Sequence, residues 1–376
     1  MDNLPEPIEL PFIQFDSKTA DYILGLEKLR GKGIEGTTPA LWFTQLKRAF
    51  MLMESVCSSR IEGNHTTVVE YAQKITQQSP AQTVPQKSNE AIQEIANLEE
   101  AIDYIEHAPA EINDSFIFKL HEMTVRDLIK EGDPVMSYRT QNVAINGSAH
   151  EPPSPESVPG YMRYLLQFIN QKSAPKYDLL KIAVVHHRFV WIHPFTNGNG
   201  RTARLLTYAM LLKAFDVSDS HIINPTAIFC SNREMYYQML HIADSLENEG
   251  VCAWCDYMLQ GLLNEVKKIE LLSSKDYVQS KILTPMIDFA LANRQITENV
   301  YKILKTAIRK EIFQASDISL LFSNKYKASR EIRSLQDAKY IKPIASNARK
   351  YYLNLESPLF GTLFQILEKE GFLKEG

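Results

Sequence analysis

The spacing of apolar positions along this chain predicts a protein built mainly of α-helices. Between residues 38 and 275 apolar side chains recur at helical spacing, and short polar stretches separate the segments. Strand-like alternation in this part is confined to residues 139–148. Residues 76–89, rich in Gln, Ser and Pro, predict a linker between helices. The prolines within residues 4–11 predict an extended segment that runs along the helical body.

The pattern changes from about residue 297. Helices are predicted over 299–310, 315–321 and 325–339, followed by short strands at 340–344 and 350–353, an order typical of a winged helix-turn-helix. Residues 325–350 hold eight Lys or Arg and two acidic residues, a net charge of plus six in a chain whose total is -4. This surface suits DNA phosphates, while docking for homodimer formation or target selection is the alternative.

Composition adds few constraints. The 376 residues, 44% hydrophobic and 23% charged, are ordinary for a globular protein of two or three domains. No apolar run approaches the ~20 residues that a bilayer span requires, and the acidic start is no signal peptide, so we expect a cytoplasmic protein without membrane contact. Cys252 and Cys255 have redox or zinc spacing, but no second pair accompanies them, so we interpret both as helix residues.

The densest candidate chemistry lies in residues 193–204, with the sequence His-Pro-Phe-Thr-Asn-Gly-Asn-Gly-Arg-Thr-Ala-Arg. Between Gly198 and Gly200 the backbone is free to take positive φ angles that point N–H groups into one anion-binding concavity. A helix predicted over 201–213 adds its unpaired N-terminal amides at the same place. Arg201 and Arg204 lie on one face of its first turn, where their spacing suits two adjacent phosphates.

His193 follows an apolar run, residues 189–192, that predicts the end of a buried helix. A neutral imidazole at the mouth of an anion site suits a general base. Phe195 is expected to anchor the loop in the core. The pattern therefore predicts a triphosphate site with its own proton acceptor.

This run resembles the signature of the Fic family, His-x-Phe-x-Asp/Glu-Gly-Asn-Gly-Arg-x-x-Arg, and departs from it at Asn197, where the family usually has a carboxylate that holds magnesium. An amide oxygen is a weaker ligand for this cation. The resemblance implies a Fic-type helical bundle with a small β-hairpin flap, and a transferase that moves AMP from ATP, with Mg²⁺, onto a Tyr, Thr or Ser hydroxyl of a target protein or of itself. By that resemblance His193 is the base, and the nucleotide is bound by Thr196, Asn197, Gly198, Asn199, Gly200, Arg201 and Arg204.

A second segment, residues 58–64, lies near the end of a helix predicted to start at about residue 39, with Gly63 as its C-cap. It resembles the inhibitory motif of the same family, Ser/Thr-x-x-x-Glu-Gly/Asn, with Ser58 and Glu62 in the two marked places. The resemblance implies that Glu62 pairs with Arg204 and fills the space of the γ-phosphate. In some members this glutamate helps to hydrolyse AMP off a target, so a deAMPylase is an alternative.

Two further segments are placed by the same resemblance. Residues 139–148, with a tight turn at Asn146-Gly147, predict a flap that holds the target peptide by main-chain hydrogen bonds; an ordinary surface hairpin is the alternative. Asn232 and Tyr236 or Tyr237 suit the edge and face of adenine, and core packing is the alternative for the aromatics.

Three regions are therefore expected: a helical region with the inhibitory motif over 1–110, a catalytic core over 111–275 and a winged-helix domain over 276–376. The competing class of function is a DNA-binding regulator in which the same core senses a nucleotide.

Overall fold

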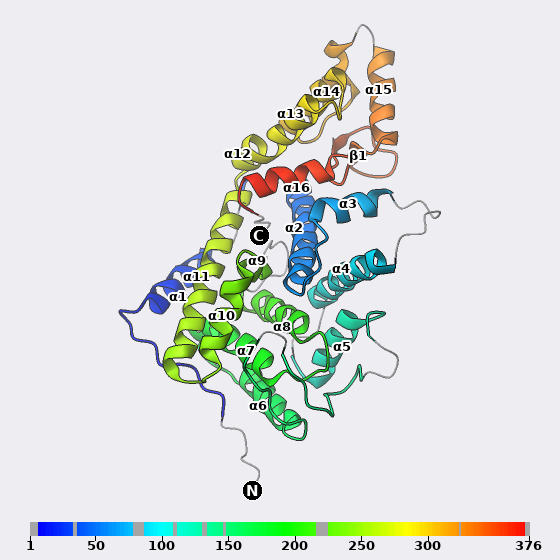
Figure 1. Ribbon diagram of the computed structural model, residues 1–376. Helices are drawn as coiled ribbons and strands as arrows, with labels where there is room; N and C mark the ends of the chain where they lie inside the picture. The colour runs from blue at the N-terminus through cyan, green and yellow to red at the C-terminus, as the bar shows by residue number, and fades with distance from the viewer. Residues whose placement is uncertain are drawn as a thin grey trace.

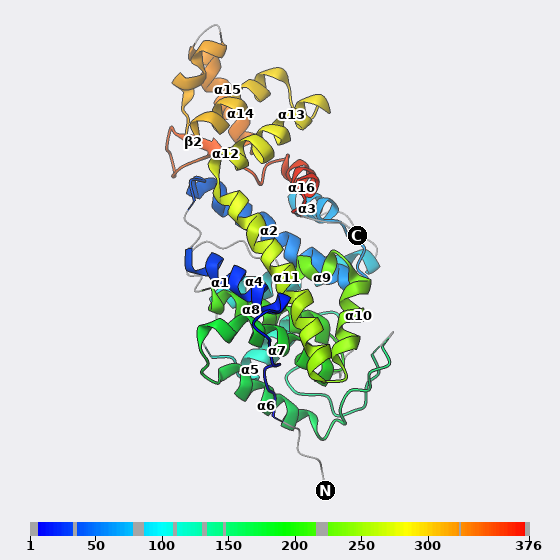
Figure 2. The ribbon, with the colours of Figure 1, turned by 90° about the vertical axis from the view of Figure 1, so that its left-hand side faces the viewer.

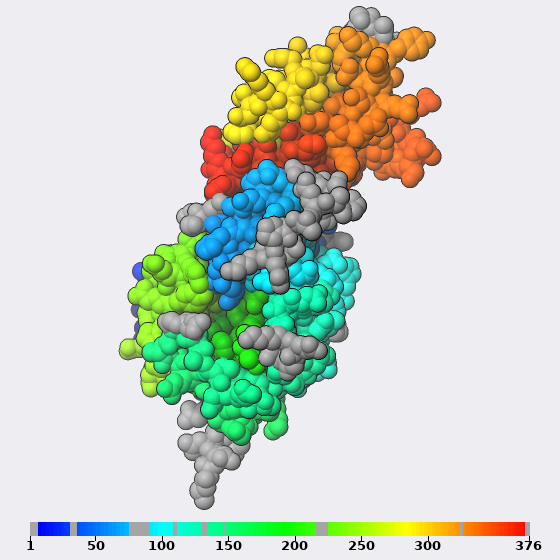
Figure 3. All heavy atoms as spheres, turned by 45° about the vertical axis from the view of Figure 1, so that its right-hand side comes forward, coloured from blue at the N-terminus to red at the C-terminus, as the bar shows by residue number. Residues whose placement is uncertain are grey.

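The computed structural model describes residues 7–32, 36–77, 86–107, 111–129, 134–145, 148–215, 225–322 and 325–372 (Figure 1). These residues are mainly helical, as predicted, and the sheet that they contain has two antiparallel strands. In space-filling form the C-terminal elements make a lobe above a larger helical body (Figure 3).

The body is a bundle around the helix pair that flanks residues 193–198. Its apolar core draws on side chains of every helix from α4 to α11, and the extended residues 7–14 pack along it as predicted, through Ile8, Leu10 and Ile13. The elements of the body are α1 (Lys18–Lys32), α4 (Gln86–Glu106), α5 (Asp114–Val125), α6 (Val158–Asn170), η1 (Pro175–Tyr177), α7 (Asp178–Ile192), α8 (Asn199–Ala214), α9 (Thr226–Cys230), α10 (Arg233–Ala243) and α11 (Asn248–Ser273).

A second core joins α2 and α3 to the C-terminal lobe. The long helix α11 runs from the body up to this lobe, and α2 also extends between the body and the lobe (Figure 2). The elements built around the second core are α2 (Ala40–Ile61), α3 (Val68–Gln77), α12 (Lys275–Tyr277), η2 (Val278–Leu283), α13 (Thr284–Ala292), α14 (Glu298–Lys310), η3 (Ala315–Leu321), α15 (Lys325–Asp337), β1 (Ile341–Pro343), β2 (Tyr351–Leu353) and α16 (Phe360–Lys369).

Helix α2 connects the two cores, because Trp42 lies in the second core and Ile61 in the first. Pro39 precedes its first turn. At its end Gly63 takes a φ of 100°, and the backbone N–H groups of Gly63 and Asn64 donate to the carbonyls of Arg60 and Ser59. These two bonds form a Schellman cap, so the predicted C-terminal role of Gly63 is confirmed.

Two predicted segments need correction. The linker expected over 76–89 is shorter, since α3 continues to Gln77 and α4 begins at Gln86. The strand pair expected over 139–148 is not formed by residues 139–145 and 148, which carry no strand; its turn, residues 146–147, lies outside the described residues. An antiparallel pair is found instead at β1 and β2, where the sequence also predicts strands.

The helices and strands predicted beyond residue 297 are confirmed, with α15 ending at Asp337. Cys252 and Cys255 lie in α11, as expected, and all four cysteines are free thiols. Among the described helices none combines the length and the apolar character needed to cross a bilayer.

Candidate active site

His193 ends α7 and begins the loop that leads to α8. Its backbone is left-handed, with φ 51° and ψ 60°. The ring Nδ1 lies 3.2 Å from the Val190 carbonyl, which can only accept, so Nδ1 carries the proton and Nε2 keeps its lone pair. Burial lowers the pKa of His193 to about 4, against the opposing effect of that carbonyl. The imidazole is therefore neutral at pH 7 and able to accept a proton.

Asn199 fixes the loop from within. Its Oδ1 accepts from the backbone N–H of Phe195 at 2.9 Å, and its Nδ2 donates to the Phe195 carbonyl at 2.7 Å. The Asn199 side chain is buried, so both of its polar groups are used inside the protein. Phe195 is buried as predicted, with its ring stacked on His121. The group with which Asn199 can bind a ligand is therefore its backbone N–H, at the N-terminus of α8.

Arg139 fixes the same loop from outside. Its Nε donates to the His193 carbonyl at 2.8 Å, and its backbone N–H donates to the Pro194 carbonyl at 2.9 Å. Its Nη1 and Nη2 reach the carbonyls of Gln141 and Pro153. The sequence places Arg139 only at the start of the predicted flap, because a single arginine in a polar segment carries no signal of the carbonyls that it will meet.

The two glycines of the loop serve different purposes. Gly198 has a φ of 73°, and a Cβ on it would lie 2.7 Å from Cγ1 of Val125, so glycine is required there. Gly200 lies within the first turn of α8 and has no positive φ, which corrects the expectation that both glycines adopt it. A Cβ on Gly200 would lie 2.4 Å from Oε1 of Glu62. The absence of a side chain at Gly200 therefore makes room for the glutamate.

The ion pair expected between Glu62 and Arg204 is present. The Nη2 of Arg204 donates to Oε1 of Glu62 at 2.8 Å, and its Nε donates to Oγ of Ser58 at 2.9 Å. Arg204 is buried, whereas the Glu62 side chain keeps 34% of its surface exposed. Burial acts to raise the pKa of Glu62, but the charges of Arg204, Arg201 and Arg233 outweigh it and lower this pKa. Glu62 is thus ionised at neutral pH and forms an ion pair with Arg204.

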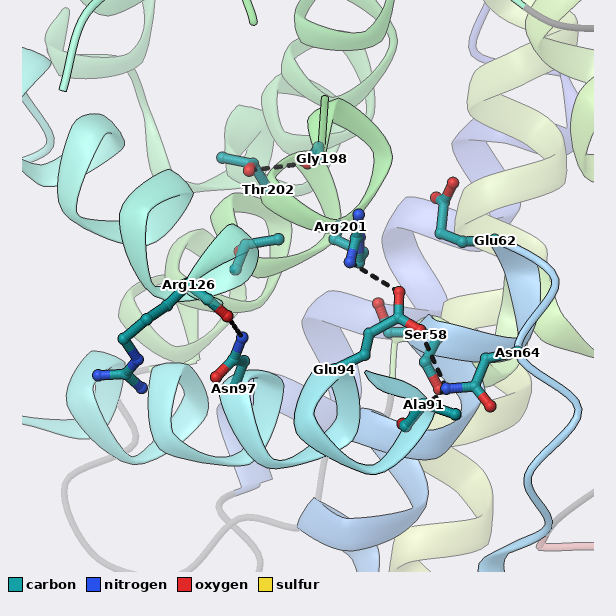
Figure 4. Close-up of polar contacts among 12 residues, drawn as sticks. Ser58, Glu62, Asn64, Ala91, Glu94, Asn97, Arg126, Gly198, Arg201 and Thr202 are labelled. Atoms are coloured by element: carbon teal, nitrogen blue, oxygen red, sulfur yellow. Dashed lines mark hydrogen bonds and ion pairs between the residues drawn. The ribbon is translucent and has the colours of Figure 1, made fainter. Parts of the chain in front are cut away.

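Arg201 is also paired in this structure. Its Nη1 donates to Oε1 of Glu94, on α4, at 2.7 Å (Figure 4). The sequence predicts that both arginines face a phosphate site, which agrees with their position on α8, but it gives no sign of Glu94. A glutamate in a helix about a hundred residues upstream resembles any solvated helix residue until the fold brings it to Arg201.

Thr196 and Asn197 lie at the exposed tip of the loop. The Asn197 backbone carbonyl lies 3.1 Å from Nε2 of His121. Within the described ranges no group of three or more His, Cys, Asp or Glu side chains is placed to hold a metal ion. The magnesium contact expected at Asn197 stays a prediction.

A cavity of about 790 Å³ opens beside the C-terminal end of α7, where Val190 and Trp191 line it. Tyr237 and Arg233 line it from α10, with the Arg233 guanidinium 5.5 Å from the centre of the Tyr237 ring. Tyr236 is buried instead, and its hydroxyl lies 3.0 Å from Nε2 of His186. The structure thus distinguishes the two tyrosines that the sequence leaves open.

Asn232 precedes α10 and is not among the residues that line this cavity. The Asn232 side chain caps α10 by accepting from the Met235 N–H at 2.9 Å. Ile145 and Ser148, on either side of the turn that lies outside the described residues, line the cavity.

Comparison with known proteins defines the class. Residues 111–211 match the model of the Fic/DOC family. Two solved structures share the fold: a Fic family protein from Desulfovibrio desulfuricans, with a TM-score of 0.57 and 20% identity over 92% of this chain and 98% of that one, and a Fic domain-containing signaling protein from Bacteroides thetaiotaomicron, with a TM-score of 0.52 and 19% identity over 68% and 97%. The similarity to the Fic/DOC family model thus covers residues 111–211, which include the run of residues 193–204.

Among curated proteins the chain is similar to enzymes named for one activity. It is 31% identical over 195 residues to "Protein adenylyltransferase Fic" of Nematostella vectensis, covering 50% of this chain and 42% of that protein. It is 28% identical over 169 residues to "Protein adenylyltransferase fic-1" of Caenorhabditis elegans, covering 43% and 31%. The chain thus spans less than half the length of these relatives.

Proposed function

We propose that this protein is an adenylyltransferase that transfers AMP from ATP to a Tyr, Thr or Ser hydroxyl of a target protein, including its own, and that Glu62 inhibits it. The observation that carries the proposal is the neutral imidazole of His193 beside the N-terminus of α8. Relatives named protein adenylyltransferase support the choice of AMP transfer.

The proposed reaction uses His193 as general base. The target hydroxyl oxygen attacks the α-phosphorus of ATP, its proton passes to Nε2 of His193, and the bond to the bridging oxygen of pyrophosphate breaks. The products are an AMP-modified side chain and pyrophosphate. The depressed pKa of His193 keeps it in the acceptor form, although it makes the imidazole a weak base, so approach of the anionic substrate is expected to raise its basicity.

The charge of the leaving group would be held by the N-terminal amides of α8 and by Arg201 and Arg204. Magnesium would enter with ATP and neutralise the phosphates, and the Asn197 amide oxygen is the protein group proposed to contact it. Asn199 and Arg139 act on geometry, since their bonds to the backbone at Phe195 and His193 hold the base beside this anion site.

The adenine is proposed to enter the cavity between α7 and α10. Tyr237 supplies an aromatic face there, and Asn232 stands at the start of the same helix. Tyr236 packs in the core below, so its part is to support the pocket. The target segment is proposed to lie along residues 139–145, of which Ile145 lines this cavity.

Glu62 is proposed to inhibit in two ways. It occupies the guanidinium of Arg204, and its negative charge opposes a polyphosphate at the same place. Because the carboxylate is ionised and partly exposed, it is also positioned to orient a water molecule, which keeps AMP removal as the second candidate activity of this site.

Intact-mass measurement of the Glu62→Gly variant incubated with ATP and magnesium tests the proposal. We expect the Glu62→Gly variant to gain the mass of one AMP unit to a greater extent than the native chain does. The Glu62→Gly/His193→Ala variant is expected to gain none. A folded Glu62→Gly protein that binds ATP but gains no mass would overturn AMP transfer. Unchanged labelling relative to the native chain would remove Glu62 from inhibition.

The C-terminal lobe has an observation of its own that favours DNA binding. Helix α15 buries Ala328, Ile332 and Leu335 and exposes Tyr326, at 89%, with Arg330 and Arg333. In a winged helix-turn-helix the apolar face of such a helix packs in the core, and the exposed basic face enters a DNA groove. We expect the full chain to retard a random duplex at low salt, and Arg330→Glu/Arg333→Glu to abolish the shift. A native chain that retards no duplex would favour docking to protein.

A further inference from the structure

Glu94 of α4 forms an ion pair with Arg201, whereas Glu62 pairs with Arg204. Its Oε1 accepts from Nη1 of Arg201 at 2.7 Å, and both side chains are only 14% exposed. Figure 4 shows Glu94 and Arg201 facing each other across the gap between α4 and α8. A charge pair with so little solvent around it is screened weakly and has a defined geometry.

The other oxygen of Glu94 is bound to the segment that follows Glu62. The Nδ2 of Asn64 donates to Oε2 of Glu94 at 2.9 Å and to the Ala91 carbonyl at 2.8 Å. Asn64 is also part of the cap that ends α2, through its N–H to the Ser59 carbonyl. Glu94 is therefore linked through Asn64 to the turn on which Glu62 sits (Figure 4).

The Arg201 guanidinium does not use all of its donors in this arrangement. Its Nε is buried and has no hydrogen-bond partner among the described residues. A buried donor without a partner is unfavourable, so the conformation held by Glu94 is not the one that satisfies this side chain best. A polyphosphate, with several acceptor oxygens, is a group that would satisfy it.

Two carboxylates thus face the two arginines of the phosphate site. Burial raises the pKa of Glu94, Arg201 and Asn64 counteract this, and the charge of Glu62 raises it further, which places the two carboxylates within electrostatic reach of each other. Their two negative charges stand where the arginines are expected to meet two phosphates.

We propose that Glu94 is a second inhibitory carboxylate, which withholds Arg201 from the polyphosphate while Glu62 withholds Arg204. The inference rests on the proposed nucleotide site. Removal of Glu62 alone then frees one arginine of the two, and full affinity for MgATP requires that Glu94 also releases Arg201. Asn64 couples the two events, because movement of the α2 cap removes a hydrogen bond from Glu94.

Calorimetric titration of MgATP into variants made in a His193→Ala background, where no AMP is transferred, tests this role. Glu94→Gln keeps the shape of the side chain and removes its charge. With Glu62→Gln present in both proteins, we expect the variant that also carries Glu94→Gln to bind MgATP roughly five- to tenfold more tightly than the one that does not. Glu100→Gln is the matched control, since Glu100 lies on the same helix, is exposed and pairs with Arg126. It is expected to leave the affinity unchanged.

Weaker binding by Glu94→Gln would overturn the proposal and make Glu94 a residue that positions Arg201 for the phosphates. Unchanged binding would overturn it as well. Asn64→Ala, which leaves the Glu94 charge in place, is expected to shift affinity in the same direction by a smaller factor. Since binding is measured without transfer, failure of Glu62→Gly to gain AMP in the mass experiment would refute the proposed function without deciding the role of Glu94.

Discussion

The Oε1 of Gln45, on α2, accepts a hydrogen bond from the backbone N–H of Leu355 at 2.7 Å, just beyond β2. The same side chain donates through Nε2 to the Leu353 carbonyl at 3.1 Å, so it satisfies two backbone groups of the C-terminal lobe. Gln45 lies in the helix that carries Ser58 and Glu62 at its other end. The lobe therefore contacts the same helix that places Glu62 at Arg204.

Gln45→Ala is expected to lower the free energy of unfolding by roughly 2–4 kcal/mol, because two buried backbone groups would lose their partners. Urea unfolding followed by circular dichroism measures the change. Gln336→Ala, at an exposed position of α15, is the control and is expected to change stability by less than about 0.5 kcal/mol. Equal effects of the two substitutions would contradict the role given to Gln45.

Gly200→Ala tests the contact between Glu62 and the start of α8. The added Cβ would fall 2.4 Å from the Glu62 carboxylate and displace it from Arg204, at a cost of roughly 1–3 kcal/mol when the partial exposure of Glu62 is allowed for. In the Glu62→Gly background this clash is gone and the remaining close contact is with Nη1 of Arg204 at 3.1 Å, the end of a flexible side chain, so alanine should stabilise the helix by up to about 1 kcal/mol. A double-mutant cycle by urea unfolding measures this coupling; additive effects would show that no contact exists.

The pH dependence of AMP transfer by Glu62→Gly should follow His193. The base acts when deprotonated, and a pKa of about 4 keeps it so, which puts the acid limb of the free enzyme near pH 4 and not near the usual value of about 6.5. The negative charge of Glu62 raises this pKa, so its removal shifts the limb further in the same direction. The measurement is kcat/KM, obtained from initial rates between pH 4 and 8, with folding monitored at each pH.

A half-maximal rate near pH 6.5 would contradict the neutral state of the half-buried His193. His107→Ala is the control, since His107 lies away from the signature at the end of α4 and should leave the profile unchanged.

Asn197→Asp should lower the magnesium concentration that half-saturates AMP transfer, by roughly tenfold, because a carboxylate is a charged ligand for a hard cation and an amide is neutral. The titration is made with Glu62→Gly as the parent. Thr196→Asp adds the same charge at the neighbouring exposed position and should have a smaller effect. If both substitutions act alike, the effect is a general one of charge and the proposed contact at Asn197 is refuted.

Much of this site was predictable because its information is local. The run of residues 193–204 contains the histidine proposed as base, the turn and the arginines close together in the sequence, and α7, α8 and the end of α2 lie where the sequence places them. The pairing of Glu62 with Arg204 was predictable through the resemblance to a family motif, and the contact is observed at 2.8 Å. The inhibitory role itself remains a prediction.

Other features were beyond the sequence because they depend on which surfaces the fold brings together. Periodicity shows that a side chain lies on the buried face of a helix but not what it meets there, so Glu94 at Arg201 and Arg139 at His193 carry no local signal. The same limit applies to the tyrosines of α10, since adjacent helix positions point about 100° apart and only packing decides which faces the cavity. A similar limit applies to the strand pair predicted at 139–148: residues 139–145 and 148 form no strand, and the backbone N–H of Arg139 donates to the Pro194 carbonyl, a partner that the sequence does not indicate.

By itself, the sequence determined the helical class, the loop chemistry and the glycine at residue 198, since these follow from side-chain size, charge and backbone freedom over a few residues. The tertiary structure decided the neutral state of His193, the two carboxylates that face Arg201 and Arg204, and the attachment of α2 to the C-terminal lobe. Desolvation and ion pairing require groups distant along the chain to meet, and only the packing of α2, α4 and α8 brings them together.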